Sequence, residues 1–459
     1  MRTLDQILTK KDYSRKTPAS LFYKDSPLWQ KLLAIGCVFF LSVAGLGEWK
    51  VLNGMLGGLP KAITLGVIGL AMLYTLFYPD EKRLREIWKP TLLYMSLMVA
   101  LFFWSMVIWI KNFATVSSMI RSCSKLVFQS IAILTAVALV YLFREKAIEL
   151  FTISICITNG AIMLLCIPDY GVAASIQSLV TCLVTFGEAV GYARQLEIHD
   201  LTFVFGQMIL YYAVFAPRTT RQEKRKRWLY LLACIWFFLV GMKRIAIPAV
   251  VLFILIALLL RKRKVPSWFY PAVGVCYILF FLAFLYCVRN GIITALLLRF
   301  GIDMMGRDYL WSMANPYYEF SVTYLGHGFE YVDTIIGQWY SAGLINHPYP
   351  FHNDILKVFV EVGFPGFLLW SGIQYVLTPL FWQRYADQQT ALLYMCELGY
   401  MTVTYLTDNT AFYFWSTMAL RLVAFSYAME RKKPPEPKVW MPDSRQEMRD
   451  RIRILMKEV

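Results

Sequence analysis

Unbroken apolar runs of about 15 to 22 residues recur along the chain, and they constrain its fold more than any other feature. A helix needs about 20 mostly apolar residues to cross the roughly 30 Å hydrocarbon core of a bilayer. The chain of 459 residues is 58% hydrophobic and 17% charged, whereas a soluble domain carries about 25% charged residues. No alternating strand pattern interrupts the runs. We therefore expect an all-α polytopic membrane protein.

The apolar runs and the basic blocks between them predict the topology. About twelve transmembrane helices are expected, at residues 32–47, 61–78, 90–110, 126–143, 148–167, 200–216, 228–242, 245–260, 267–288, 353–380, 388–407 and 411–430. Lys and Arg gather in the N-terminal segment and at residues 82–85, 144–146, 221–227, 261–264 and 431–433. If the helices alternate in direction, all of these blocks fall on one side, which the positive-inside rule identifies as the cytoplasm. Both termini are then cytoplasmic.

This topology divides the chain into five segments. They are a cytoplasmic N-terminal segment at 1–31, transmembrane helices 1–9 at 32–288, an extracytoplasmic loop at 289–352, transmembrane helices 10–12 at 353–430 and a cytoplasmic C-terminal tail at 431–459. The start of the chain is polar and basic, so we expect the first apolar run to be an uncleaved helix and not a signal peptide. The long loop is rich in Tyr, Trp, Gly and Pro, which is typical of an ordered cap. A second outside segment, 168–199, suits a helix at the membrane surface.

Net charge and cysteine content exclude two classes of function. The net charge of +16 does not indicate a nucleic-acid partner, because the basic residues lie in short blocks between apolar runs. The nine cysteines are scattered, and none is spaced as CxxC. We interpret them as small packing residues and expect neither a disulfide framework nor a metal site. The histidines also lack HxH or HxxxH spacing, which argues against a metal.

Lys243 and Arg244 interrupt two apolar runs of about 15 residues each, 228–242 and 245–260. At about 1.5 Å per residue such a helix spans roughly 22 Å, which is shorter than the hydrocarbon core. The tip of this hairpin is therefore expected within the outer half of the membrane. A cation there should face a polar cavity or an anion. The alternative is that both side chains snorkel to the interface.

Two positions of the long loop are candidates to bind or activate a substrate. The guanidinium fork of Arg307 matches two phosphate oxygens at once, although a surface pair with Asp308 or Glu319 is an alternative. His352 closes the loop, and its neutral imidazole can accept a proton from a hydroxyl group. Asn353 follows as an N-cap for the next helix.

Other polar residues lie at helix ends or within helices. The outer ends of two predicted helices carry Arg194, His199, Asp200, Asp408 and Asn409. Glu397 lies inside the helix predicted at 388–407. An acid within a membrane helix is a candidate for function, and pairing with a neighbouring helix explains Glu397 equally well.

In their order along the chain, these residues resemble the signature of the O-antigen ligase/polymerase family. The matching positions are Arg244, Gly306-Arg307 with Trp311, Gly326-His327-Gly328, His352-Asn353 and Gly363-Phe364-Pro365-Gly366. The resemblance covers roughly residues 190–370. Many family members also have an Arg followed by a Pro-Asn pair before the helix corresponding to 200–216. Arg194 is present here, but His199-Asp200-Leu201 replaces that pair.

The resemblance implies a membrane glycosyltransferase of the C-type class that is inverting and needs neither metal nor cofactor. Arg244 and Arg307 would hold the pyrophosphate of a donor such as undecaprenyl-pyrophosphate-linked oligosaccharide, and His352 would orient or deprotonate the acceptor hydroxyl. The loop at 289–352 would then be the catalytic loop. Further substrate contacts are expected from Arg194, Lys243, Asn353, Trp311, Gly328 and Asp408. The expected location is the cytoplasmic (inner) membrane of a bacterium, with the site facing outside.

Three functions fit these expectations. The first is a polysaccharide polymerase that extends a lipid-linked repeat unit in the cell envelope, with membrane lipids, a chain-length regulator and a flippase as candidate partners. The second is an O-antigen ligase that uses a different acceptor, such as a lipid core. The third is a secondary transporter or flippase of lipid-linked sugars, which twelve spans would suit. Against the third, no half repeat is visible, and the polar residues gather on one side.

The topology is testable by cysteine labelling. Cysteines introduced at residues 300–345 should react with an impermeant thiol reagent in intact cells, because six basic regions place this loop outside. Cysteines at 221–227 and 261–264 should react only after lysis. Labelling of the 300–345 region only after lysis would overturn both the topology and the location of the site.

Overall fold

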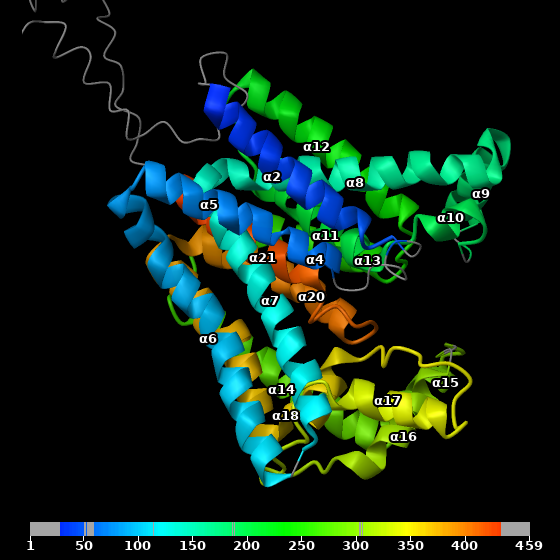
Figure 1. Cartoon of the computed structure of the whole chain (residues 1–459). Coiled ribbons are helices and arrows are strands. Elements are labelled where there is room, and N and C mark those ends of the chain that lie inside the picture. Colours follow the sequence, from blue (N-terminus) through cyan, green and yellow to red (C-terminus); the bar gives the residue numbers. More distant parts are fainter. Residues whose placement is uncertain are drawn as a thin grey trace, which may run out of the picture.

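The computed structural model describes residues 28–49, 52, 59–112, 114–185, 187, 189–302, 304 and 306–432, and the regular structure in this part of the chain is entirely helical (Figure 1). The expected all-α class is therefore confirmed. Most of the predicted N-terminal segment and of the C-terminal tail lies outside the described residues.

The helices follow one another with short connections. The first half of the chain contains α2 (Leu28–Leu46), α4 (Leu59–Ile63), α5 (Leu65–Phe77), α6 (Glu81–Lys111), α7 (Val116–Phe143), α8 (Ala147–Tyr170), α9 (Val172–Thr185), α10 (Tyr192–Gln195) and α11 (His199–Leu210). The second half contains α12 (Arg221–Val240), α13 (Ala246–Leu260), α14 (Phe269–Arg289), α15 (Ile292–Arg299), α16 (Arg307–Ala314), α17 (Tyr331–Ser341), α18 (Asp354–Ser371), α19 (Thr378–Tyr385), α20 (Gln388–Tyr405) and α21 (Phe414–Arg431). Short π-helices extend α11 to Phe215 and join α18 to α19.

Each segment predicted to cross the membrane coincides with one helix or with consecutive helices. Five described stretches are long and apolar enough to cross by length and composition, namely Leu28–Leu46, Glu81–Lys111, Val116–Tyr170, Phe269–Arg289 and Asp354–Tyr385. The stretch from Val116 contains both α7 and α8, which meet at Arg144 with a φ of 49°. The other helices are shorter or more polar, so the number of crossings stays a prediction.

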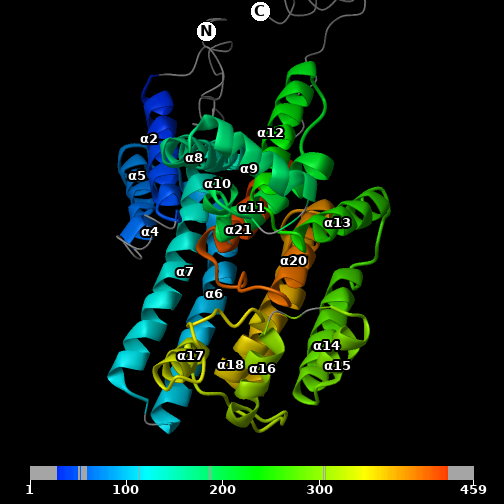
Figure 2. The same cartoon turned by 90° about the vertical axis from the view of Figure 1, so that its right-hand side faces the viewer.

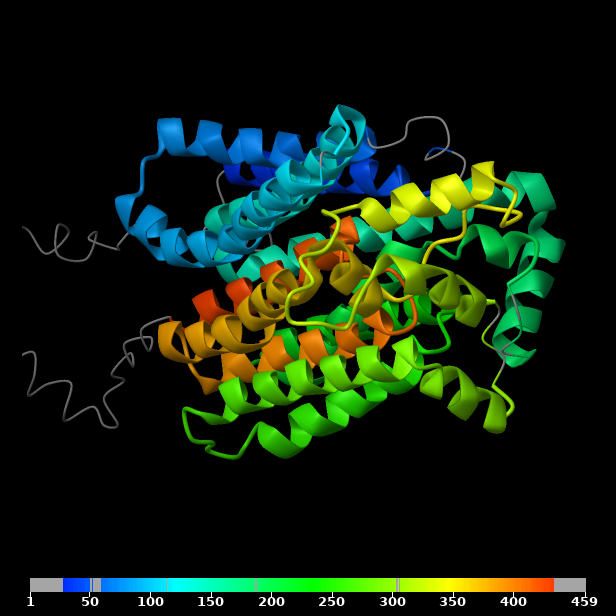
Figure 3. The ribbon, with the colours of Figure 1, turned by 90° about the horizontal axis from the view of Figure 1, so that it is seen from below.

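The two segments predicted to lie outside occupy the same end of the molecule. In Figure 1, α9 and α10 lie at the right, above α15, α16 and α17, while the turn between α5 and α6 lies at the left. Figure 2 looks onto that right-hand side, and α9, α10, α16 and α17 face the viewer. The view from below in Figure 3 again places α17 (yellow) and the α9–α10 region (blue-green) at the right. This arrangement agrees with the alternation of spans.

The core of the bundle is formed by α11, α20 and α21. Nearly all of their residues are buried, whereas α13 and α14 expose many apolar side chains. The helix α21 packs along α7, α11 and α20. A helix that is buried on every side belongs to the interior of a bundle. The polar residues at the ends of these three helices are therefore enclosed by protein, and this is where the candidate site lies.

A backbone crossing between two glycine motifs attaches the long loop to α18. The helix breaks at Gly363, where φ is 65° and ψ is −173°. The N–H of Gly328 donates to the carbonyl of Glu361 at 2.7 Å, and the N–H of Phe364 donates to the carbonyl of Tyr324 at 2.8 Å. A Cβ at Gly363 would lie 2.2 Å from the carbonyl carbon of Leu325. The segment can cross the helix this closely because side chains are absent there.

Gly363→Ala should destabilise the protein. A residue with a Cβ in this conformation costs of order 1–3 kcal/mol, and the clash with Leu325 adds to that cost. Gly372→Ala is a matched control, because a Cβ there meets nothing within 4 Å and its φ is helical at −61°. We expect a lower melting temperature in detergent for Gly363→Ala alone. Equal melting temperatures for the two variants would contradict the crossing.

Candidate active site

The N-terminus of α18 is tied to the turn between α20 and α21. The backbone N–H of His352 donates to Asn409 Oδ1 at 2.9 Å. In return, Asp354 Oδ2 accepts from the N–H of Ala411 at 2.6 Å. These two bonds bring the end of the long loop against residues 408–411, which the sequence places 55 or more residues away. They fix the position of His352 relative to Asp408.

Lys243 lies at the tip of the α12–α13 hairpin and faces anions. Its Nζ is 3.0 Å from Glu197 Oε1, 3.0 Å from His199 Nδ1 and 3.8 Å from Asp408 Oδ2. Only 12% of the side chain is exposed. The expectation that a cation at this tip faces an anion is thus confirmed for Lys243. Arg244, by contrast, is exposed, so the two neighbouring cations point in different directions.

Asp408 links Lys243 to His352. Its Oδ1 lies 3.5 Å from His352 Nδ1 and its Oδ2 lies 3.8 Å from Lys243 Nζ. Burial alone would raise the pKa of Asp408, but the nearby His352 ring and the charges of Lys243 and His199 outweigh burial and hold this pKa below its usual range. Asp408 is therefore a buried anion between two basic groups. This position favours orienting His352 over touching a substrate.

The backbone at His352 is strained. Its φ is 52°, a region that residues other than glycine rarely adopt. Strain of this kind gathers at functional sites, where surrounding bonds hold it in place. Here those bonds come from Asn409 on one side and from Asn353 on the other, whose Oδ1 accepts from the N–H of Leu356 at 3.0 Å. The expected N-cap is thus confirmed, and Asn353 Nδ2 has no hydrogen-bond partner among the described residues.

The motif around Arg307 is joined to His352 through Trp311. Arg307 opens α16 and Trp311 lies one turn later, where it is buried. Trp311 Nε1 donates to the carbonyl of Phe351 at 3.2 Å, directly before His352. The alternative surface pairs of Arg307 with Asp308 or Glu319 do not form. Within the described residues the Arg307 guanidinium has no ion pair or hydrogen bond, which suits a side chain kept for a ligand.

The other histidines of the loop have different surroundings. His327 Nε2 lies 2.6 Å from the carbonyl of Tyr317, and its ring stacks on Tyr331 at 4.2 Å. Burial lowers the pKa of His327, so it is a neutral packing residue. At the neighbouring Gly328, a Cβ would lie 2.2 Å from Trp109 Nε1. Packing against Trp109 therefore explains why this position is a glycine. His347 is exposed.

Asp200 anchors the first turn of α21. Its two carboxylate oxygens accept from the backbone N–H groups of Trp415 and Ser416 at 2.8 and 2.9 Å. These are donors that a helix N-terminus leaves without an intrahelical partner. Arg194, which precedes this stretch, is exposed on the short helix α10. Glu397 lies apart in α20, fully buried, and neither of its oxygens has a hydrogen-bond partner in the described part of the chain.

A polar cavity of about 470 Å³ adjoins this cluster. Glu197 and His199, which contact Lys243, also line the cavity, together with Glu48, Lys61 and Lys125. The sequence patterns did not identify Glu48, Lys61, Lys125 or Glu197, because no local motif contains them. Among the described residues, no group of three or more His, Cys, Asp or Glu side chains is placed to hold a metal ion.

Comparison with known families gives a match to part of the chain. Residues 229–371 match the family model described as O-antigen ligase. This part of the chain is similar to the O-antigen ligase domain. The matched region runs from α12 to the end of α18, so it includes Lys243, Arg307 and His352. No curated protein matches the chain.

The O-antigen ligase domain confirms the resemblance inferred from the motifs. This family consists of membrane glycosyltransferase-like enzymes that act on lipid-linked oligosaccharides. The match therefore supports a function of the O-antigen ligase or polymerase type in general. The match assigns neither the residues of the site nor the acceptor.

The His352–Asp408 pair should behave as one unit in a transfer assay. A positioned base contributes roughly 10²–10⁴ in rate, so His352→Ala should slow glycan transfer by about that factor while donor binding persists. Asp408→Asn should also slow transfer, and the double variant should be no slower than the worse single variant. His327→Ala and His347→Ala are controls with smaller effects. If the rate reduction of the double variant equals the product of the two single reductions, the two residues act separately.

Proposed function

We propose that the chain is a polysaccharide polymerase. It would transfer a glycan from a polyprenyl-pyrophosphate donor to a hydroxyl group of a lipid-linked repeat unit at the outer face of the cytoplasmic membrane. The observation that supports this most is the cluster of Lys243, Asp408 and His352, which lies where the long loop meets the bundle. Such a cluster suits group transfer at the membrane surface, because it combines an oriented base with nearby cations.

In this proposal, Arg307 and Arg244 bind the pyrophosphate of the donor. Both side chains keep their charge and can form two parallel hydrogen bonds to phosphate oxygens. Negative charge grows on the pyrophosphate as the anomeric carbon–oxygen bond breaks. Cations placed there therefore stabilise the transition state more than the ground state. Neither a nucleotide nor a metal is needed for this step.

His352 acts on the acceptor as the base that takes the proton of its hydroxyl group. The acceptor hydroxyl attacks the anomeric carbon from the face opposite the pyrophosphate, which inverts the configuration. Its proton passes to His352 Nε2, because Nδ1 faces Asp408 at 3.5 Å. The Asp408 carboxylate stabilises the imidazolium that forms, and the pyrophosphate leaves with the bonding electron pair. The imidazolium then releases its proton to water, so the site returns to its starting state.

A ligase is the second candidate, because the matching family model is described as O-antigen ligase. The two enzymes would share the donor and the chemistry and differ only in the acceptor. An assay with the purified protein in liposomes and a lipid-linked repeat unit separates them. A ladder of lengthening products supports the polymerase. Transfer only when a distinct lipid core is added supports the ligase, and movement of the lipid without transfer would indicate a flippase.

Replacing arginine by lysine tests the proposed pyrophosphate contacts. Arg307→Lys and Arg244→Lys should each lose most activity although the protein inserts and folds, since lysine keeps the charge but lacks the fork. Arg299→Lys is a matched control on exposed α15 of the same loop and should remain fully active. Donor binding and turnover are measured separately. Full activity of Arg307→Lys would mean that only a generic charge is required there.

A further inference from the structure

Glu197 lies on the short connection between α10 and α11, and the fold fixes its position. Its two neighbours in the chain, Leu196 and Ile198, are buried. The N–H of Ala193 donates to Ser178 Oγ at 3.1 Å, which ties α10 to α9. The carboxylate of Glu197 is therefore held against the tip of the α12–α13 hairpin, where its Oε1 contacts Lys243.

Glu197 and Asp408 share Lys243 unequally. Lys243 Nζ lies 3.0 Å from Glu197 Oε1 but 3.8 Å from Asp408 Oδ2. A close ion pair has a nitrogen–oxygen distance of about 2.7–2.9 Å, so Lys243 compensates the charge of Glu197 more than that of Asp408. The charge of Asp408 thus remains available to His352, whose Nδ1 lies 3.5 Å from the other carboxylate oxygen. Negative and basic groups alternate along the row from Glu197 to His352.

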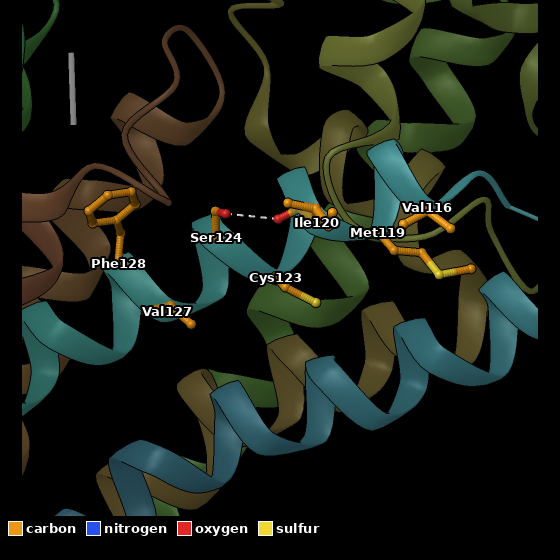
Figure 4. A pocket seen from close by; sticks show the side chains of 7 residues that line it. All are labelled: Val116, Met119, Ile120, Cys123, Ser124, Val127 and Phe128. Atoms are coloured by element: carbon orange, nitrogen blue, oxygen red, sulfur yellow. Dashed lines mark hydrogen bonds between the residues drawn. The ribbon is translucent and has the colours of Figure 1, made fainter.

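The other cations near Glu197 are paired elsewhere. Two lysines line the polar cavity beside Glu197, and each has a carboxylate partner of its own, namely Glu48 for Lys61 at 3.4 Å and Glu330 for Lys125 at 3.7 Å. The side chains of α7 that Figure 4 shows, from Val116 to Phe128, are uncharged. The basic groups in contact with Glu197 are therefore Lys243 and His199, whose Nε2 lies 3.4 Å away.

Further titratable groups face this row from α9, from α18 and from the turn before α21. They are Cys182, which interacts with Glu197 and Arg244, Asp354, which accepts from the N–H of Ala411, and Tyr413, which donates to Asp408 Oδ1 at 3.5 Å. In the described part of the chain, Lys243 is the side chain whose contacts join Glu197 to Asp408. A change at Glu197 therefore reaches Asp408 chiefly through Lys243.

We propose that Glu197 is a positioning residue, which holds Lys243 away from Asp408 so that the Asp408 carboxylate serves His352. This inference rests on the proposed function, in which His352 takes the proton of the acceptor hydroxyl. Without the carboxylate of Glu197, Lys243 closes on Asp408. Asp408 then stabilises the imidazolium of His352 less, because its charge is compensated by the lysine. His352 becomes a weaker base, which is protonated only at lower pH.

Glu197→Gln tests this role, because it removes the charge and keeps the size of the side chain. It should lower kcat about threefold at an unchanged KM, since a weaker base transfers the proton more slowly. The acidic limb of the pH profile should move down by about one unit, within the range that a contacting charge produces. Glu197→Asp should restore part of the loss. Glu319→Gln, which changes an exposed carboxylate of the long loop, is the matched control and should behave as the wild type.

Lys243→Met distinguishes positioning from a merely structural role. It removes the cation that competes for Asp408, so the acidic limb should move up, opposite to the shift in Glu197→Gln. Because Glu197 acts through Lys243, the double variant should match Lys243→Met alone. If Glu197→Gln has the same effect on the pH profile with and without Lys243, the inference is wrong.

Chemical modification separates this inference from the proposed function, because it needs no substrate. Diethyl pyrocarbonate acylates neutral imidazole, and mass spectrometry of peptides follows the reaction of His352 as a function of pH. The midpoint for His352 should fall in Glu197→Gln, whereas exposed His347 serves as the internal control and should not change. Equal midpoints for His352 in wild type and Glu197→Gln would overturn the inference even if the wild type transfers glycan. A lowered midpoint in a protein that transfers no glycan would leave the positioning role standing and refute the polymerase.

Discussion

The candidate site depends on one buried carboxylate. Asp408 is buried, with 6% of its surface exposed, yet stays ionised, because His352 and Lys243 lie against its two oxygens. A buried charge is stable only when it is paired, so the three side chains fix one another. They come from the end of the long loop, the tip of the α12–α13 hairpin and the turn before α21. Removing the carboxylate would leave the end of the long loop joined to the turn before α21 by the bonds of His352 with Asn409 and of Asp354 with Ala411, but would remove the contact of that turn with Lys243.

A second network of charges holds the helices of the long loop in place. Lys357 of α18 contacts Asp333 at 2.6 Å and Glu330 at 3.6 Å, and Glu330 also contacts Lys125 of α7 at 3.7 Å. Lys357 and Glu330 are buried and Asp333 is partly exposed, and the opposite charges compensate one another, as buried ions require. The network joins α17 to α18 and α7 on the side of the cavity. Together with the crossing at Gly363, it holds the loop that carries Trp311 and His352.

The sequence predicts features whose cause is local. The helices follow from apolar periodicity, the cap at Asn353 follows from residue type, and the anion beside Lys243 follows from the cost of a bare cation in a membrane. Contacts between distant segments leave no such signal. Glu197 has no motif around it, and it becomes meaningful only once Lys243 lies 3.0 Å away. The glycine motifs can be recognised in the sequence, but only the structure shows that they allow a close backbone crossing.

The cations of the site differ in whether they are paired with a carboxylate. Lys243, Lys61 and Lys125 each lie against a carboxylate, so they hold segments together and add little net attraction for an anion. Arg307 has no such partner among the described residues, although its neighbour Trp311 is fixed by the carbonyl of Phe351. Because Trp311 anchors this helix, an anionic ligand at Arg307 would require little reordering of the backbone. In the proposed reaction, the paired lysines hold the site together and Arg307 binds the substrate.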